Sequence, residues 1–387
     1  RGLGDVYKRQ VYISAFCMCS LSVLLNSCDD FLKEEPLDMK SSDQFWKTKA
    51  DAESGVNALY FGGVPYLHNT DVGGGWTPKA TMWGGIVSGL YVDKRKDRTF
   101  TTASEGCNFN IESFDDIAMK YWHEFYKGIS RANFVIANIP TMTGVLDEAT
   151  INNYVAQGKF FRAYGYFWLV KEFGGVPYIS EPYTSTEGMY KERLSAEEIY
   201  KNIETDLLDI VNGDALPNKT FYDNGCYVTK AMAQTLLAQV YLQWAGAPLN
   251  GGADYYDKAA QMALKVINEG PHSLIDPNGT TDGLNSAYNV IKTTKSSAEI
   301  IYAKEYNYSD YSVGNSYACR SIGADAFQWG VFHPGGDVLY NAYLPCNMLI
   351  DSYDPADIRG HEKQFFFKEY TDASGKTHTL NLSLIHI

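Results

Sequence analysis

Aromatic side chains in glycine-rich stretches are the residues of this sequence best suited to chemistry. The chain has 29 Tyr, 19 Phe and 7 Trp among 387 residues. Most fall at helical spacing, which predicts core packing, but a few stand in stretches without period: Trp76, Trp83, Tyr91, Phe327 and Trp329. An aromatic ring beside polar neighbours is a platform on which a sugar can stack. For each ring alone, anchoring of its own loop explains it equally well; as a set, the rings favour a binding site.

The signatures of enzymes are absent from the sequence. It contains no GxSxG, HExxH, Walker or GxGxxG motif. Its seven histidines are scattered, and His123 stands in an aromatic helical stretch that predicts a core position. We therefore expect no catalysis, cofactor or metal, although 46 acidic residues leave the carboxylate pair of a glycosidase as an unmarked alternative. The net charge of −13 argues against nucleic acid as a partner.

The N-terminal region has the pattern of a secreted lipoprotein. An apolar run over residues 11–25 leads to Leu25-Asn26-Ser27-Cys28, which resembles a bacterial lipobox, and acidic residues follow at once. This order predicts a signal peptide over 11–27, lipidation of Cys28 and an acidic tether over 28–40. Acyl chains on Cys28 would anchor the protein to a membrane without a spanning helix. The alternative is a plain leader followed by an ordinary cysteine.

The two ends of the chain are related to each other in an unusual way. Asp5–Gln10 and Leu382–Ile387 can be back-translated into DNA sequences that are reverse complements. That sequence is similar to the transposon end used in library preparation. We therefore interpret residues 1–10 and 382–387 as adapter-derived and the chain as a fragment, and we exclude both segments from fold reasoning.

Four cysteines remain in the body of the chain: Cys107, Cys226, Cys319 and Cys346. They are far apart and show no CxxC spacing, which favours neither zinc nor redox chemistry. Buried thiols are the default interpretation, and three disulfide pairings stay open.

The body of the chain, residues 41–381, is expected to fold as one large, mainly α domain with minor β structure. Helical periodicity and end signals predict these helices: 41–59, 116–139, 148–173, one beginning at the capping box of Ser195, 229–244 and 255–268. The regions 61–110 and 273–345 lack a helical period and hold the aromatic rings described above. Residues 298–311 predict a strand or a short extended segment, and residues 346–360 predict a short helix and a turn.

Two of the expected helices repeat a pattern. The segments "KFFRAYGYFWLVKEFGG" and "KAMAQTLLAQVYLQWAG" begin at Lys159 and Lys230, and an amphipathic helix follows each. Small residues beside aromatic ones in paired helices are typical of tetratricopeptide (TPR) repeats, in which each pair buries its apolar face against the next. We therefore expect TPR-like helix pairs over about 116–270.

Five motifs carry a family resemblance, in this order: "WHEFYKGISRANFVIANIP", "GKFFRAYGYFWLVKEFGGVPYI", "RLSAEEIYKNIETDLLDI", "YVTKAMAQTLLAQVYL" and "YDKAAQMALKVINEG". Together with the cysteine-then-acid start and "DSYDPADIRG", they resemble the SusD/RagB-like outer-membrane nutrient-binding lipoproteins. The resemblance covers about residues 24–370.

The resemblance implies a surface lipoprotein of the outer membrane with a TPR-like scaffold. Such a protein caps a TonB-dependent, SusC-like barrel and binds oligosaccharides in its loops without cleaving them. No residue motif for sugar contact is shared across that family. Our candidate glycan contacts are therefore chosen from the loop regions of this sequence and are not carried over from the family: Trp76, Trp83, Tyr91, Asp93, Tyr308 and Trp329. A lid or scaffold of such a transporter that binds peptide or protein and no sugar is the alternative.

Overall fold

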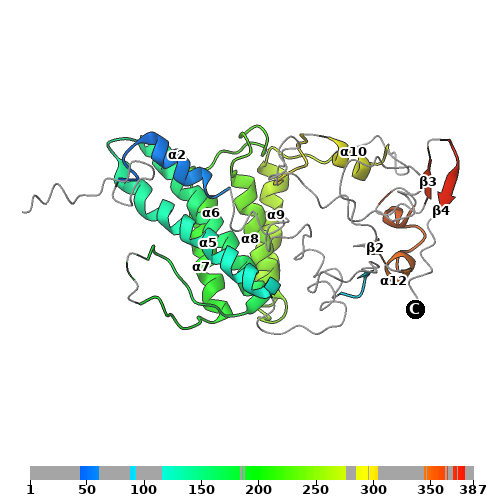
Figure 1. The fold of residues 1–387 in the computed structure, drawn as a ribbon, viewed down its shortest axis with the longest axis horizontal. Coiled ribbons are helices and arrows are strands. Elements are labelled where there is room, and N and C mark those ends of the chain that lie inside the picture. The colour runs from blue at the N-terminus through cyan, green and yellow to red at the C-terminus, as the bar shows by residue number, and fades with distance from the viewer. Residues whose placement is uncertain are drawn as a thin grey trace, which may run out of the picture. The chain divides into compact units, whose positions relative to one another are not determined.

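The computed structural model of the chain is shown in Figure 1. It describes residues 44–60, 88–92, 116–183, 185, 188–275, 285–294, 296–303, 344–345, 347–361, 364, 369–372 and 374–379. The chain divides into two compact units, Arg1–Thr48 and Lys49–Ile387. All the helices and strands of the described residues belong to the second unit.

The first described helix, α2 (Lys49–Asn57), is shorter than the expected range 41–59. Residues 44–48 form a turn and bends instead of helix. The backbone of Trp46 has a φ of 64°, which lies in the left-handed region. A residue other than glycine in this region cannot continue a right-handed helix, so the expected first turns do not form.

The scaffold of the second unit is an array of helices that pack in sequence order. α5 packs on α6, α6 on α7, α7 on α8 and α8 on α9, and α2 lies against α5 and α6. Figure 1 shows α5 to α9 side by side. Their bounds agree with the expected helices to within a few residues: α5 (Asp116–Asn138), α6 (Glu148–Phe173), α7 (Ala196–Asn212), α8 (Lys230–Ala245) and α9 (Ala253–Glu269).

The helices begin at side chains that cap free backbone amides. Asp147 accepts from the amide of Thr150 before α6, and Thr229 accepts from the amide of Met232 before α8. Before α7, Ser195 and Glu198 form the predicted capping box. Each cap contributes about 1 kcal/mol. The caps fix where the long helices start and therefore which of their residues face the neighbouring helices.

The two repeated segments form the inner helices of the array. α6 lies between α5 and α7, and α8 lies between α7 and α9. A helix covered on two sides must be apolar around much of its circumference, and this explains why both segments are rich in small and aromatic residues. A Cβ atom on Gly158 would come within 2.9 Å of the Ile136 side chain, so this glycine lets α5 and α6 approach closely.

The remaining elements are short. A two-stranded ladder pairs β1 (Tyr91–Val92) with β2 (Leu344–Pro345), and a hairpin pairs β3 (Glu369–Thr371) with β4 (Thr377–Thr379). α12 (Asn347–Asp351) and a 3₁₀ turn at Ile358–Gly360 confirm the expected helix and turn.

The C-terminal part differs from the expectation in two places. The described residues 298–303 of the segment 298–311 contain a turn and a bend but no strand, and a helix absent from the prediction, α10 (Ala287–Thr293), precedes them. Ser286 caps this helix and also donates to Gln364 over 2.7 Å. α10 has only seven residues, and its capping residue Ser286 bonds to a residue distant in sequence. The apolar periodicity of so short a segment could not predict a helix. Among the described residues, no helix is both long and apolar enough to cross a membrane.

Candidate functional site

Most of the residues predicted from the sequence to bind a ligand lie outside the described residues. These are Trp76, Trp83, Asp93, Tyr308 and Trp329, and the predicted lipidation site Cys28 lies outside them as well. The backbone of Tyr91 is described, and it pairs with Pro345 in the β1–β2 ladder. This pairing places two residues from within the region 61–110 beside the end of the region 273–345, which is far away in sequence.

The described residues form a pocket of about 290 Å³ on the helical scaffold. Its walls come from α2, from the first half of α6 and from the α7–α8 loop (residues 213–229). We call it the scaffold pocket. Its lining residues are Glu53, Val56, Asn57, Asn153, Tyr154, Gln157, Asn224 and Tyr227.

Hydrogen bonds hold the floor of the scaffold pocket in place. The Tyr60 hydroxyl donates to Gln157 Oε1 over 2.6 Å and accepts from the amide of Val228 over 3.0 Å. Gln157 Nε2 donates to Asn153 Oδ1 over 2.7 Å, and Asn153 Nδ2 donates to the Ala215 carbonyl. This chain of bonds ties α6 to the segment after α2 and to the α7–α8 loop, so the pocket is formed in advance of any ligand.

The Tyr227 side chain forms the outer wall. Its hydroxyl donates to Asn57 Oδ1 over 3.0 Å, and its ring meets the Tyr60 ring edge-on at 5.2 Å. The preceding turn contains Gly225 and Cys226 with φ near 65°, and Asn224 Nδ2 donates to the carbonyls of Tyr227 and Val228. The turn therefore fixes the position of a ring that remains 40% exposed.

The Tyr154 hydroxyl lies in the scaffold pocket without a hydrogen bond to any described residue. Burial raises the pKa of Tyr154, and the charge of Glu53 and the neighbouring Tyr227 raise it further. The phenol is therefore protonated at neutral pH and can donate to a ligand. Among the described residues, the Glu53 carboxylate pairs only with Lys49, over 3.8 Å, so it can accept a hydrogen bond from a ligand.

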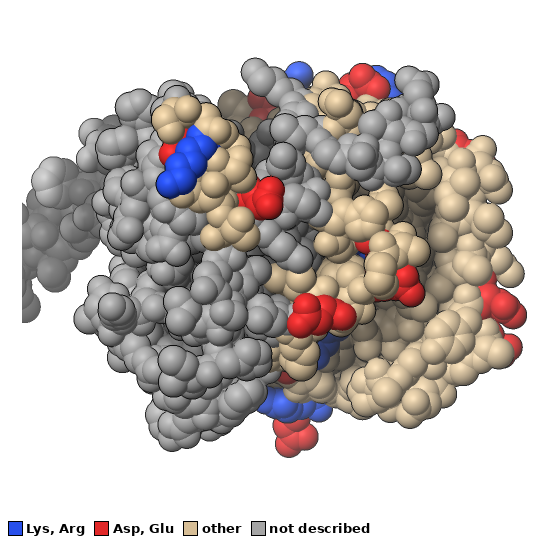
Figure 2. Space-filling model, turned by 90° about the vertical axis from the view of Figure 1, so that its right-hand side faces the viewer, with Lys and Arg blue, Asp and Glu red and all other residues tan. Residues whose placement is uncertain are grey.

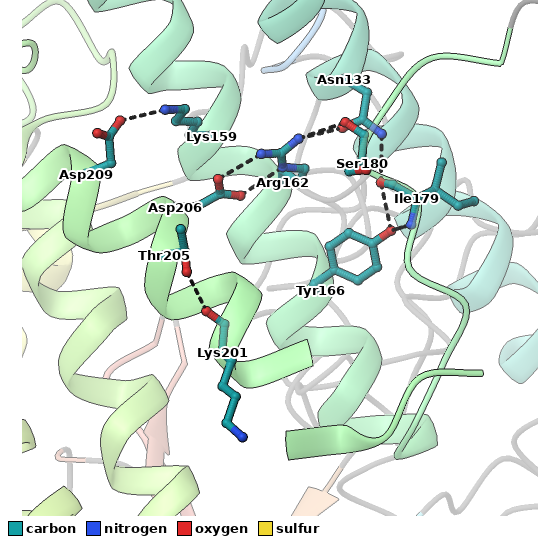
Figure 3. A network of polar contacts seen from close by, with 10 residues as sticks. All are labelled: Asn133, Lys159, Arg162, Tyr166, Ile179, Ser180, Lys201, Thr205, Asp206 and Asp209. Carbon is teal, nitrogen blue, oxygen red and sulfur yellow. Dashed lines mark hydrogen bonds and ion pairs between the residues drawn. The ribbon is translucent and has the colours of Figure 1, made fainter. Parts of the chain in front are cut away.

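In a second polar cluster, which we call the Arg162 network, the guanidinium of Arg162 forms all its hydrogen bonds within the protein (Figure 3). Arg162 Nε and Nη2 donate to the two carboxylate oxygens of Asp206 over 2.8 and 2.7 Å, and Nη1 donates to Asn133 Oδ1 and the Ser180 carbonyl. Burial alone would lower the pKa of Arg162, but the bonds and charge of Asp206 outweigh it and raise the pKa. The network joins α5, α6, α7 and the segment after α6, and both charged side chains are buried. Its role is structural.

The comparisons with known proteins agree with this architecture. The sequence model of a family described as "Starch-binding associating with outer membrane", named SusD-like, matches residues 92–242, which include α5 to α7 and most of α8. "SusD-like protein P38" of Formosa agariphila is 28% identical over 235 residues, which are 60% of this chain and 42% of that protein. A crystal structure of a SusD superfamily protein from Parabacteroides distasonis superposes with a TM-score of 0.70 at 24% identity, over 86% of this chain and 67% of the other. The chain is therefore similar to SusD-like proteins in the sequence of residues 92–242 and in its fold.

The chain spans about half the length of the curated relatives it matches. A "SusD-like protein" of Bacteroides ovatus is 23% identical over 67% of this chain, and the match covers 45% of the relative. The shared fold is the TPR-like helical array, which confirms the fold class expected from the repeated segments.

The described surface of the chain shows no concentration of basic side chains on the face drawn in Figure 2. There, acidic and basic groups of the described residues are scattered among uncharged ones. No group of three or more His, Cys, Asp or Glu in the described part of the chain is arranged to hold a metal ion.

Sequence reasoning missed the scaffold pocket. Its side chains come from three segments, and its amides and tyrosines have no motif spacing of their own. One signal was available: "NNYVAQG" in α6 places Asn153, Tyr154 and Gln157 at helical spacings of one and three within an otherwise apolar segment. Polar residues on an inner helix need partners or a ligand, and this could have marked the site.

Proposed function

We propose that the protein captures oligosaccharides at the cell surface and delivers them to a TonB-dependent, SusC-like transporter of the outer membrane. The match of residues 92–242 to a family described as starch-binding carries this proposal. A structure described as bound to a xylogluco-oligosaccharide shares the fold, with a TM-score of 0.59 at 17% identity. An oligosaccharide ligand also agrees with the aromatic residues in the loop regions of this sequence, because aromatic rings can stack on sugars.

The proposed glycan contacts are the loop residues Trp76, Trp83, Tyr91, Asp93, Tyr308 and Trp329. The β1–β2 ladder supports a single composite site, because it holds the backbone of Tyr91 beside Pro345. We propose on this basis that residues from 61–110 and from 273–345 contribute to one binding surface. Rings on such a surface would stack against sugar faces, while Asp93 would accept from sugar hydroxyls.

The proposal includes no catalytic step. Capture without cleavage requires binding groups held in place but no acid–base pair, and neither polar cluster of the described scaffold provides such a pair. The scaffold pocket contributes one carboxylate, Glu53, and the carboxylate of the Arg162 network is buried against a guanidinium. A glycosidase would need two carboxyl groups on opposite sides of the scissile bond.

The proposed location is the outer face of the outer membrane, with acyl chains on Cys28 as the anchor. The family description, which names association with the outer membrane, supports this location. More than one acyl chain is needed for stable attachment, as in a multiply acylated lipoprotein. Labelling of the protein with a radioactive fatty acid tests the anchor.

The test of capture is a screen of the purified protein against neutral and acidic polysaccharides by affinity gel electrophoresis. We expect retardation by one polysaccharide class. Trp83→Ala and Trp329→Ala should each weaken binding about tenfold or more, because a buried stacking ring is a typical hot spot. Tyr256→Ala is the matched control, since Tyr256 is a half-exposed ring on α9 and belongs to neither loop region in the sequence.

Each result of the screen has a definite meaning. Unchanged binding by both tryptophan variants would refute the assigned contacts. Shorter sugars in a mass spectrum after long incubation would show a hydrolase instead. A folded protein that binds no polysaccharide would refute glycan capture and leave the peptide- or protein-binding lid.

A further inference from the structure

The scaffold pocket lies apart in sequence from every proposed loop contact. Its walls are α2, α6 and the α7–α8 loop, whereas the proposed contacts lie in 61–110 and 273–345. A volume of about 290 Å³ is at the lower end of the ligand-pocket range of roughly 300–1,000 Å³. The pocket is therefore suited to a small group, such as one unit of a larger ligand.

The charge of the lining restricts the chemistry of this ligand. None of the eight lining residues is Lys, Arg or His, so the lining offers no cation to a phosphate, sulfate or carboxylate group. Glu53 is the one carboxylate, too few for a divalent cation. Val56 is the one aliphatic side chain of the lining, which disfavours a lipid tail. A neutral, polar ligand remains.

The lining groups that make no hydrogen bond within the described part of the protein are suited to bind the hydroxyl groups of a ligand. The phenol of Tyr154 and Nδ2 of Asn57 can donate, whereas Oδ1 of Asn224 and the carboxylate of Glu53 can accept. A hydroxyl both donates and accepts, so a ligand with several hydroxyls can use all four groups at once. The half-exposed ring of Tyr227 adds the aromatic platform on which the apolar face of a sugar ring can lie.

The binding groups are held by rigid elements. Asn153 and Gln157 bond to each other and to the backbone or Tyr60, and Tyr227 is fixed through Asn57. Side chains ordered before binding lose little conformational entropy when the ligand arrives. A shallow patch of unordered surface amides would lack this advantage.

We propose that the scaffold pocket is a second saccharide site, which holds one sugar unit of a neutral glycan with Tyr227 as its platform and Tyr154, Asn57, Asn224 and Glu53 as its polar contacts. The class of ligand rests on the proposed function, whereas the place and the contacts rest on the geometry of the pocket. A glycan held at two separate places on the protein gains avidity from the second contact.

The experiment uses saturation-transfer NMR on the purified full chain with the methyl glycosides of glucose, galactose, mannose and xylose as probes. We expect at least one probe to bind. Tyr227→Ala should weaken it tenfold or more, and Tyr154→Phe about fivefold, the loss typical of one hydrogen bond. Tyr256→Ala is the control for a ring elsewhere. Melting temperatures show whether each variant is folded, and Tyr154→Phe removes no hydrogen bond to any described residue.

A variant with both Trp83→Ala and Trp329→Ala separates this inference from the proposed function. Binding that survives in this variant and is weakened by Tyr227→Ala and Tyr154→Phe supports the second site. Binding that is lost in it and unchanged by both tyrosine variants overturns the second site and supports the loop contacts. A protein that binds a polysaccharide but none of the four probes also overturns the second site, and one that binds neither refutes glycan capture as well.

Discussion

Two polar clusters lie on the same helix, α6, and they are built in opposite ways. The Arg162 network is charged and buried, and the guanidinium bonds to three partners on other elements. The scaffold pocket, which begins at Gln157 and runs toward the start of α6, is lined mainly by neutral amides and phenols, and Tyr154 keeps an unused hydroxyl. In one cluster the polar groups are satisfied within the protein; in the other some of them wait for a ligand.

The difference teaches how to separate structural from functional polarity on one element. A buried ion is tolerated only when its partners are complete, and such a cluster can offer nothing to a ligand. Amides and phenols cost less to leave partly unpaired at a pocket surface, where water can serve them until a ligand arrives. Spare hydrogen-bonding capacity, rather than charge, therefore marks the binding side of α6.

The largest effect is expected from Asp206→Ala, which leaves Arg162 buried without its counter-ion. We expect a loss of about 3–5 kcal/mol in the free energy of unfolding, as for other buried pairs broken on one side. Urea unfolding measures it. Asp209→Ala is the matched control on the same helix. It breaks an ion pair between Lys159 and an Asp209 side chain that is 64% exposed, and should cost less than about 1 kcal/mol.

The comparison would fail if Asp206→Ala were as mild as the control. That result would mean that water reaches Arg162 and that the network is open after all. The double change Arg162→Met with Asp206→Leu sharpens the test. Because it removes both charges, it should destabilise the protein less than Asp206→Ala alone.

The long helices could be predicted from the sequence because their signals are local. The capping box at Ser195 and the glycines after Phe173 lie within a turn of the ends they set. Helices such as α6 could also be recognised from the sequence. Because α6 and α8 are packed on two sides, both need small and aromatic residues, and these residues recur in the two repeated segments. Here the fold and the sequence pattern have the same physical cause.

The scaffold pocket could not be predicted because its contacts are distant in sequence. Tyr227 meets Asn57 across 170 positions, and Tyr60 meets Gln157 across 97. No period or motif links such residues. The pairing of Arg162 with Asp206 could not be predicted either, because the two residues are 44 positions apart. The apolar residues of α6 indicated only that the helix packs in the core. The loop contacts remain predictions, since only the backbone of Tyr91 is described among them.

An intermediate effect is expected from Tyr60→Phe, which affects the shared boundary between scaffold and pocket. The hydroxyl both donates to Gln157 and accepts from the amide of Val228, so its removal leaves two partly buried groups unpaired. We expect a loss of about 1–3 kcal/mol in unfolding free energy. Tyr154→Phe is the control within the pocket: it should change stability by less than about 0.5 kcal/mol, as for a group with no partner. Equal losses in the two variants would contradict the assignment of Tyr154 as a spare group.

The smallest effect on stability is expected at the exposed pair of Asp357 and Arg359. Like the buried pair of Arg162 and Asp206, it is joined by more than one hydrogen bond. In "DSYDPADIRG", Asp357 Oδ1 accepts from Arg359 Nε over 2.9 Å and from the Arg359 amide over 3.0 Å. These hydrogen bonds lower the pKa of Asp357 to about 2. The folded-state pKa lies below the unfolded value of about 3.9, so the pair contributes stability above pH 4 and loses it as pH falls from about 4 to 2.

Carbon-detected NMR of the Asp357 carboxyl group follows this titration directly. Arg359→Gln should move the pKa of Asp357 back toward its ordinary value, because the side-chain hydrogen bonds to the guanidinium are the largest cause of the shift. Stability at pH 7 should change little, since water screens an exposed pair. A large loss in the free energy of unfolding of Arg359→Gln would contradict this expectation. It would mean that the number of hydrogen bonds in a charge pair, and not its burial, decides how much the pair stabilises the protein. The contrast drawn from the Arg162 network would then need another cause.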